Sequence, residues 1–293
     1  MTFINIFLAL IIWSVNPEAF TLPILDFPVR WYGLLFALSF IVGQQVMTFI
    51  YKKEGRPNGE VDTLTIYVAL ATVIGARLGH VLFYDPIYFF HNPSKIIATW
   101  EGGLASHGGG IGLFIALYLF ARKTQVPYLW ILDRMAIITA STGCLIRFGN
   151  LMNSEMIGTP TTMPWGFVFV LVDDVPRHPA QLYESIFCFF LFIGLFLGWY
   201  KFRERMANGF LFGWFLTILF SVRFIDEFFK INQEPFEEGM ILNMGQLLSI
   251  PFTTTKSYWR LTSFGIRGPR MLFGNSGMPK ICKSNTPRRF TIG

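Results

Sequence analysis

Long apolar segments alternate with short polar connections along most of the chain, which is the pattern of a protein that crosses a membrane several times. Six segments of 18–21 residues carry few charges. About 20 apolar residues in an α-helix cross the hydrocarbon core of a bilayer, and a helix satisfies its own backbone hydrogen bonds in lipid. The pattern therefore predicts six membrane-spanning helices, at Tyr32–Ile50, Leu64–Tyr84, Leu104–Ala121, Tyr128–Ile146, Gln181–Tyr200 and Phe210–Phe229.

The two ends of this apolar region are less regular. A seventh segment, Met240–Phe252, has thirteen residues, or about 20 Å of helix, which is too short for a complete span. The opening Met1–Trp13 is also too short, and it lacks the basic start and cleavage site of a signal peptide. The predicted fold class is an all-α polytopic membrane bundle with six spans, an incomplete seventh and a short N-terminal interfacial helix.

Composition supports the membrane interpretation and divides the chain in two. Of 293 residues, 53% are hydrophobic and only 14% charged, against about 25% charged in an average soluble domain. The net charge of +6 comes from residues 253–293, which hold eight Lys and Arg and no acid, whereas residues 1–252 hold 16 basic and 18 acidic residues. We interpret 1–252 as a membrane-embedded domain and 253–293 as a basic tail that is disordered or the product of an altered reading frame. A fold that binds nucleic acid is not indicated.

Charges in the predicted connections give an orientation. One set of connections holds eight basic residues: Lys52, Lys53, Arg56, Arg122, Lys123, Lys201, Arg203 and Arg205. The opposite set holds three: Lys95, Arg177 and Lys230. Because basic residues favour the cytoplasmic side, the first set is predicted to be cytoplasmic and the long connection 148–177 to be outside.

In this orientation, nearly all of the costly polar residues of the spans lie toward the outer end. They are Tyr32, His107, Arg147, His178, Glu184, Arg223 and Glu227. Ionisable groups inside a membrane usually face a cavity or one another, so they mark candidate functional sites. Arg77, Arg147 and Arg223 would place three guanidinium groups in the outer half of the bilayer. Since guanidinium forms forked hydrogen bonds to phosphate, a pocket for an anionic lipid headgroup is indicated.

Structural roles are the alternatives for several of these residues. Arg223 and Glu227 are four apart and would suit an ion pair on one helix face. Arg77 and His80 would equally suit packing between helices, and His178 would suit a cap on the next span. Cys144, Cys188 and Cys282 show neither paired nor metal-binding spacing.

The stretch SHGGGIG, Ser106–Gly112, adds a candidate base beside a glycine run. Glycines allow a backbone to approach a ligand closely, and they are also an ordinary device for close packing of membrane helices. His107 stands next to the run, and histidine exchanges protons near neutral pH. The sequence leaves both interpretations of the glycines open.

Six ordered motifs resemble the prolipoprotein diacylglyceryl transferase family. RFGNLMNSEMIG, Arg147–Gly158, is similar to the family signature, although Ile146 replaces the glycine that usually precedes its arginine. The other similar motifs are RWYG around Tyr32, SHGGGIG, HPAQLYE at His178–Glu184, RFIDEFF at Arg223–Phe229 and MGQLLSIP at Met244–Pro251. The resemblance runs from about Val29 to Pro251, where the family's apolar seventh span would continue and this chain becomes polar.

The resemblance implies a transferase of the bacterial cytoplasmic (inner) membrane, with its active site toward the outer face. It would move the diacylglyceryl group of phosphatidylglycerol to the lipobox cysteine of a preprolipoprotein, the first step of lipoprotein maturation, without a cofactor or metal. The implied catalytic residues are His107, Arg147, Arg223 and Glu227. Tyr32, Asn150, Glu155 and Gly158 would join Arg147 and Arg223 in binding the lipid, with Arg77, His178 and Glu184 in support. Glu155 and Glu227 are expected to orient the arginines.

A small transporter or channel for an anionic solute or lipid is the main alternative. Transporters usually place polar groups near the midplane and contain internal repeats, neither of which this sequence shows. An acyltransferase or intramembrane hydrolase is a further alternative, although the chain has no G-x-S-x-G motif.

Overall fold

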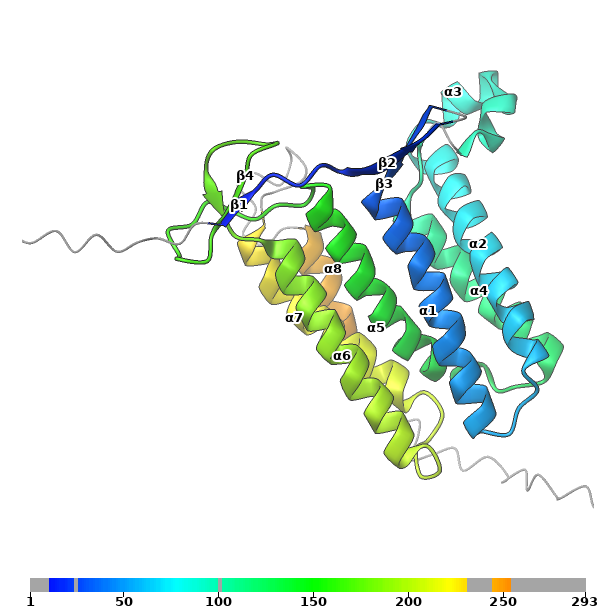
Figure 1. Ribbon diagram of the computed structural model, residues 1–293. Helices are drawn as coiled ribbons and strands as arrows, with labels where there is room; N and C mark the ends of the chain where they lie inside the picture. Colours follow the sequence, from blue (N-terminus) through cyan, green and yellow to red (C-terminus); the bar gives the residue numbers. More distant parts are fainter. Residues whose placement is uncertain (1–10, 24–25, 100–101, 231–243, 254–293) are drawn as a thin grey trace, which may run out of the picture.

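The computed structural model describes residues 11–23, 26–99, 102–230 and 244–253, and it is a helical bundle with small β elements at one end (Figure 1). The longer helices are α1 (Trp31–Lys53), α2 (Gly59–Phe83), α4 (Ser106–Thr124), α5 (Tyr128–Met152), α6 (Ala180–Phe202), α7 (Phe210–Asp226) and α8 (Met244–Thr253). Shorter helical elements are α3 (Pro86–His91), η1 (Pro93–Ile97) and η3 (Glu227–Phe229). The strands are β1 (Ile11–Trp13), β2 (Glu18–Leu22), β3 (Phe27–Arg30), β4 (Phe167–Phe169) and β5 (Pro176–Arg177).

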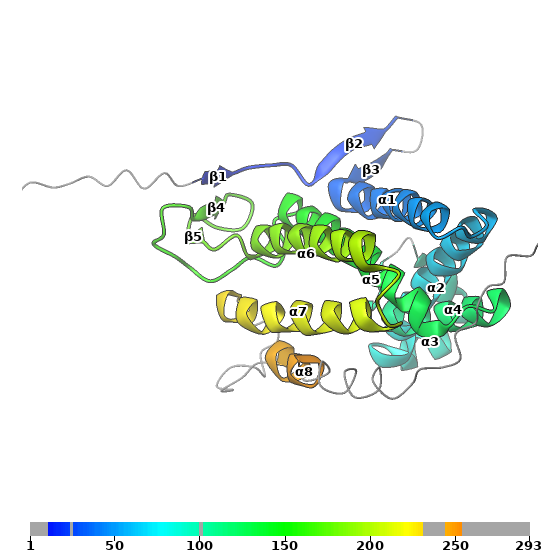
Figure 2. The ribbon, with the colours of Figure 1, turned by 90° about the horizontal axis from the view of Figure 1, so that it is seen from below.

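Helix α5 lies at the centre of the bundle. It packs against α1, α6, α7 and α4, while α2 packs mainly against α4 and α8 against α7 (Figure 2). Ile131, Ile137 and Ala136 of α5 are almost fully buried in the main core cluster. An apolar helix that is covered on several sides becomes the scaffold on which its neighbours are placed, so α5 positions the residues at both of its ends.

The helices alternate in direction, which gives the bundle two distinct ends. At the hairpin end, α1, α4 and α6 begin and α2, α5 and α7 finish, beside the antiparallel β2–β3 hairpin (Figure 1). At the opposite end lie the connections with most of the basic residues, and we call it the basic end. The alternation agrees with the predicted order of the six apolar segments.

Helix bounds follow the apolar pattern with modest differences. By length and composition, four of the described helices, α1, α2, α5 and α6, are suited to crossing a membrane. Helix α4 has 19 residues and α7 has 17. Helix α5 runs to Met152, past its expected end at Ile146, so Arg147 and Asn150 lie on its last turns. The part of the expected seventh segment that is described, Met244–Thr253, is helical.

The expected N-terminal helix is wrong for its last three residues. Ile11, Ile12 and Trp13 form strand β1, which pairs in parallel with β4. Trp13 also donates a hydrogen bond from Nε1 to the Leu151 carbonyl, 3.0 Å away. β-Branched and aromatic residues favour strands when a partner strand is present, and β4 is distant in sequence. Residues 1–10 lie outside the described part of the chain.

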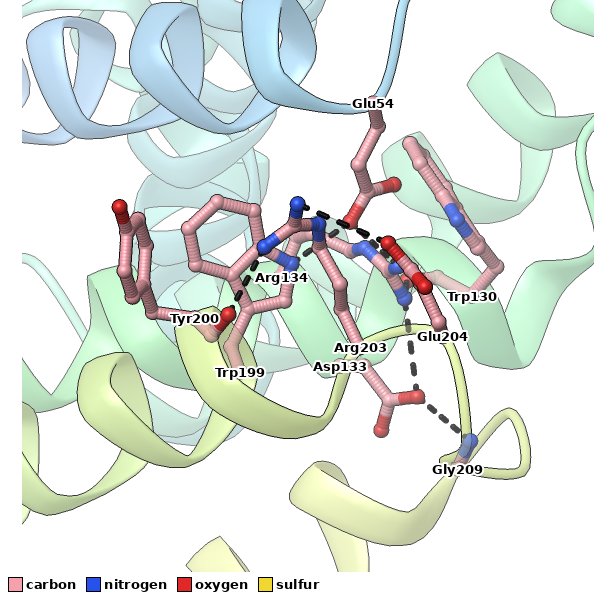
Figure 3. Close-up of polar contacts among 9 residues, drawn as sticks. All are labelled: Glu54, Trp130, Asp133, Arg134, Trp199, Tyr200, Arg203, Glu204 and Gly209. Carbon is pink, nitrogen blue, oxygen red and sulfur yellow. Dashed lines mark hydrogen bonds and ion pairs between the residues drawn. The ribbon is translucent and has the colours of Figure 1, made fainter.

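A buried polar network at the basic end corrects the expectation that nearly all such residues lie at the other end (Figure 3). Glu54 Oε1 accepts hydrogen bonds from Arg134 Nη2 at 2.7 Å and Trp199 Nε1 at 2.6 Å. Asp133 accepts the backbone N–H groups of Gly209 and Phe212 at 2.7 and 2.9 Å. Asp133 thus caps the start of α7, and the network joins α1, α5, α6 and α7.

Candidate functional site

The most concentrated ionic cluster in the described residues lies at the hairpin end, between α5, α6 and α7. Arg147 Nε lies 2.7 Å from Glu184 Oε2, and Lys230 Nζ lies 2.7 Å from Glu184 Oε1. One carboxylate thus bridges two cations from different parts of the chain. The side chains of Arg147, Glu184 and Lys230 are 21%, 10% and 4% exposed, so water screens these pairs weakly.

Lys230 also gathers the two carboxylates that precede it. Its Nζ lies 3.0 Å from Asp226 Oδ2 and 3.7 Å from Glu227 Oε2. The proposed Arg223–Glu227 ion pair is absent from the ion pairs of the described residues, and Glu227 faces Lys230 instead. The expectation that Glu227 orients an arginine is therefore wrong. With Arg147 and Lys230 against three carboxylates, the cluster has one excess acidic group.

The signature segment after Arg147 folds around Glu155. Asn150 Nδ2 and Asn153 Nδ2 donate to the two oxygens of the Glu155 carboxylate at 3.3 and 3.1 Å. Buried Gln181 donates from Nε2 to the Glu155 carbonyl. Glu155 therefore holds two amides of its own loop, and the expectation that it orients Arg147 is wrong; Glu184 has that position.

Tyr32 lies against the same helix end. A Cβ added to Gly149 would stand 3.1 Å from Tyr32 Cδ2 and 3.2 Å from its Cα. Tyr32 is also within electrostatic range of Arg147 and Glu155. The absence of a side chain at Gly149 thus lets Tyr32, at the start of α1, approach the signature segment.

Gly158 is the point at which the signature loop, the start of α6 and the end of α7 meet. Its N–H donates to the His178 carbonyl at 2.9 Å, and Thr159 N–H donates to the Phe229 carbonyl at 2.8 Å. A Cβ on Gly158 would collide with the carbonyl oxygens of His178 and Phe229. Gly158 therefore permits a close approach of three backbone segments.

His178 contacts the site through its backbone, while its ring faces Tyr183. Nδ1 lies 3.2 Å from the Tyr183 hydroxyl, and the ring packs edge-on against Phe229. The His178 side chain does not cap α6, but its carbonyl oxygen accepts the N–H of Ala180, the first residue of that helix, at 2.9 Å.

Arg77 is not available to a phosphate. Its guanidinium donates to four backbone carbonyls, those of Lys95 at 2.5 Å, Ile96 at 2.8 Å, Gly102 at 2.5 Å and Gly103 at 3.0 Å. The residue is 5% exposed. The expectation that Arg77 contributes to a phosphate pocket is wrong, and its hydrogen bonds go to carbonyls of the segment before α4, not to another long helix as the packing alternative expects. Arg77 holds together the segment that leads to α4.

The glycine run in the first turns of α4 is mainly a packing device. A Cβ on Gly108 would meet the Gly75 carbonyl oxygen and lie 2.7 Å from Gly79 Cα, and a Cβ on Gly112 would meet the Ala71 carbonyl oxygen. Spacing of small residues by four on both helices lets α2 and α4 approach backbone to backbone. Gly110, in contrast, has open space where its Cβ would be.

His107 and Arg223 lie apart from the cluster in their contacts. Both side chains are exposed, His107 on the first turn of α4 and Arg223 on the last part of α7. Within the described ranges, neither makes a hydrogen bond or ion pair with Arg147, Glu184 or Lys230. The structure thus brings Tyr32, Arg147, Asn150, Glu155, Gly158, His178, Glu184 and Glu227 together, whereas Arg77 is engaged elsewhere.

Sequence reasoning missed Lys230, Asp226 and Gln181. Lys230 was counted only as a loop cation, although it follows Asp226 and Glu227 by four and three residues, the spacing of ion pairs on a helix. Gln181 is fully buried beside the conspicuous Glu184. The helical spacing could have indicated that Lys230 pairs with Asp226 and Glu227. That Glu184 contacts both Arg147 and Lys230 depends on the tertiary fold.

Taken together, the fold and the cluster define a class of protein: a polytopic helical membrane protein with a buried ionic site at one end of its bundle. The prolipoprotein diacylglyceryl transferase family model matches residues 17–260. The chain belongs to this family.

The sequences of similar proteins align with most of this chain and with most of their own length. A protein of Tolumonas auensis is 48% identical over 245 residues, which cover 83% of this chain and 93% of the relative. Relatives from Porphyromonas gingivalis and Chloroherpeton thalassium are 47% and 45% identical, covering 83% and 82% of this chain and 91% and 90% of their own. All three are named phosphatidylglycerol–prolipoprotein diacylglyceryl transferase.

Proposed function

We propose that this protein transfers the diacylglyceryl group of phosphatidylglycerol to the lipobox cysteine of preprolipoproteins. The cysteine thiolate attacks the glyceryl carbon that carries the phosphate ester, a C–S bond forms, and the C–O bond to phosphate breaks. The thiol proton passes to a base, and glycerol phosphate leaves with the electron pair of the broken bond. The substrates named for the relatives support this assignment.

The observation that carries the proposal is the state of the Arg147 guanidinium. Its Nε edge faces Glu184, while its two Nη atoms make no hydrogen bond or ion pair with any residue in the described part of the chain. A guanidinium fixed on one edge presents the other as a fork that matches two phosphate oxygens. Arg147 is therefore suited to binding the phosphate and to stabilising the charge that develops as it leaves.

Arg223 is the second proposed phosphate ligand. It precedes Asp226 and Glu227 by three and four residues, so the helical period puts it on the side of α7 that leads to Lys230. No side-chain hydrogen bond or ion pair is formed by Arg223 within the ranges described. Glu184 contacts both Arg147 and Lys230. We therefore propose that the guanidinium groups of Arg147 and Arg223 bind the phosphate of the same lipid headgroup.

The other residues bind the glycerol part or prepare the thiol. Tyr32 and the Asn150–Glu155 pair border Arg147 and offer hydrogen bonds to hydroxyl groups. Gly158 keeps the loop close to α7. His107, exposed and next to the α2–α4 contact, is proposed to accept the thiol proton, because only the thiolate attacks carbon readily.

The proposed setting is the cytoplasmic membrane of a bacterium, with the hairpin end facing outward. Six spans are proposed, α1, α2, α4, α5, α6 and α7, with α8 as part of an incomplete seventh. The eight basic residues of the inner connections support this orientation. The basic tail predicted for 253–293 lies outside the described residues, except for Thr253, which ends α8.

Incubation of the purified full-length protein with phosphatidylglycerol and a lipobox peptide tests the proposal. We expect the peptide mass to increase by one diacylglyceryl group only when its cysteine is present, with glycerol phosphate released in equal amount. A peptide with serine in place of cysteine is the matched control. No adduct, together with uptake of a labelled anionic solute into liposomes, would favour the transporter alternative.

A further inference from the structure

A second candidate site is a groove between α6 and α7 that runs from Phe187, one helical turn from Glu184, to Arg205 at the basic end. The groove has a volume of about 850 Å³ and is bordered by apolar side chains of both helices, among them Phe190, Trp214 and Ile218. This size falls in the range of small-molecule sites. None of the ionic-cluster residues lines it.

The floor of the groove is bare helix backbone. Gly194 and Gly198 are four residues apart on α6 and both line the groove. Small residues at this spacing usually let a second helix approach closely. Here, a Cβ on Gly194 would meet nothing within 4 Å, and one on Gly198 would meet only Leu211 Cδ2 at 3.9 Å. Helix α7 therefore leaves this face of α6 open to an apolar occupant.

A cation stands at the basic end of the groove. Arg205 lines it, is exposed, and its side chain makes no hydrogen bond or ion pair with another residue in the described ranges. The neighbouring Arg203 is engaged differently: it stacks on Trp199 and Tyr200 and lies 3.8 Å from Glu204. Arg205 is thus a cation at the edge of the groove that has no partner among the described residues.

The length and charge of the groove select its occupant. From Phe187 to Phe202, α6 rises about 22 Å, which exceeds the roughly 15 Å hydrocarbon depth of one leaflet. A basic pocket between membrane helices on the positively charged side is typical of an anionic-lipid site. A soluble ligand would not match an apolar surface of this length with one terminal cation.

We infer that the α6–α7 groove binds an anionic phospholipid of the leaflet at the basic end, with an acyl chain along Gly194 and Gly198 and its phosphate at Arg205. This site differs from the one proposed for the reaction, because none of the ionic-cluster residues lines the groove and its proposed phosphate ligand, Arg205, lies at the opposite end of the bundle from Arg147. The bound lipid would fill the groove between α6 and α7.

Photolabelling of the full-length protein in lipid nanodiscs tests the inference. The probe is a phosphatidylglycerol with a diazirine on its acyl chain, in a phosphatidylcholine host, and labelled peptides are mapped by mass spectrometry. We expect label on 187–202 and 210–218. Unlabelled phosphatidylglycerol should compete about five-fold better than phosphatidylcholine, the preference that one interfacial cation provides.

Two variants and two controls distinguish a built site from surrounding lipid. Arg205→Gln should remove the five-fold preference, whereas Lys201→Gln, an exposed cation outside the groove, should keep it. Gly194→Leu should reduce groove labelling about five-fold or more, whereas Gly110→Leu on α4 should not. Equal labelling of all lipid-facing helices would mean annular lipid only. Unchanged preference in Arg205→Gln, or no groove labelling in the full-length protein, would also overturn the inference.

Discussion

At the scale of single residues, the notable feature is one carboxylate that serves two cations. Glu184 contacts Arg147 through one oxygen and Lys230 through the other. Lys230 is in turn held by Asp226 and Glu227. Because a buried carboxylate with two partners cannot turn toward one without leaving the other, the cluster restricts the direction of the Arg147 guanidinium. Lys230 is thus a positioning residue.

Replacing Lys230 tests this positioning role. In Lys230→Met, three carboxylates would remain with Arg147 as the cluster's remaining cation, and loss of one partner of a buried ion pair costs about 3–5 kcal/mol. We expect a lower unfolding temperature in detergent and weaker phosphatidylglycerol binding. Lys230→Arg keeps the charge and should restore both. If the methionine variant bound the lipid with wild-type affinity, Lys230 would have no part in placing Arg147.

His107→Gln tests the proposed base. Without a base, the thiol proton has no acceptor, so the maximal transfer rate should decrease about 10²–10⁴-fold, while phosphatidylglycerol binding stays within a few-fold. Transfer rates at saturating lipid and lipid-binding isotherms of the two proteins measure this. A wild-type maximal rate in the variant would assign the base to another group.

At the scale of elements, the α2–α4 pair depends on glycines that face each other. Gly75 and Gly79 of α2 meet Gly108 and Gly112 of α4 with almost no space between backbones. Since His107 immediately precedes this contact, the distance between the two helices sets where its side chain lies. The same glycine run thus packs the helices and places the candidate base.

Two substitutions within one motif separate packing from local helix effects. Gly108→Ala should force α2 and α4 apart and destabilise the protein by about 1–3 kcal/mol. Gly110→Ala meets open space and should be neutral or slightly stabilising, because alanine is the better helix former. Thermal unfolding of both variants in detergent is the measurement. Equal unfolding temperatures would show that the close approach is not needed.

The elements could largely be predicted, because length and apolarity determine a membrane helix by themselves. Tyr128 was identified as the start of α5 and Phe210 as that of α7, both in agreement with the structure. Strand β1 could not be predicted, since its apolar residues suit a helix equally well until β4 is placed beside them. The extension of α5 to Met152 was missed because the polar residues of the signature suggested a loop.

The sequence indicates some members of the ionic cluster, Arg147, Glu184 and Glu227, but neither Lys230 nor Asp226, and none of the pairings. Motif residues such as Arg147 and Glu184 were recognised, yet the distance between them in sequence hides their contact. Arg77 illustrates the converse. Its place in an apolar span suggested a ligand, but the carbonyls of the following loop use its guanidinium. The tertiary fold determines which polar groups form hydrogen bonds or ion pairs with each other.

At the scale of the whole molecule, each end of the bundle has a buried polar network with its own character. The Glu54–Arg134 network joins helices at the basic end and satisfies the indole of Trp199. The cluster at the hairpin end has an excess of carboxylates and an arginine edge without a partner in the described chain. We therefore interpret the first network as structural and the second as the reaction site.

Thiol labelling tests the orientation on which this division depends. Asp174→Cys lies in the exposed loop of the hairpin end and Glu204→Cys, with a side chain 86% exposed, at the basic end. In bacterial spheroplasts, a membrane-impermeant maleimide should label Asp174→Cys and should reach Glu204→Cys only after lysis. The parent protein gives the background of its own cysteines. The reverse pattern would place the reaction site inside the cell.

The rate of diacylglyceryl transfer by Arg147→Lys is the most direct measurement of the central claim, that a guanidinium fixed by Glu184 binds the phosphate of the lipid. Lysine keeps the charge and can keep an ion pair with Glu184, but it lacks the fork. We predict unchanged thermal stability and a transfer rate at least about 100-fold lower. A rate within a few-fold of the wild type would contradict the account.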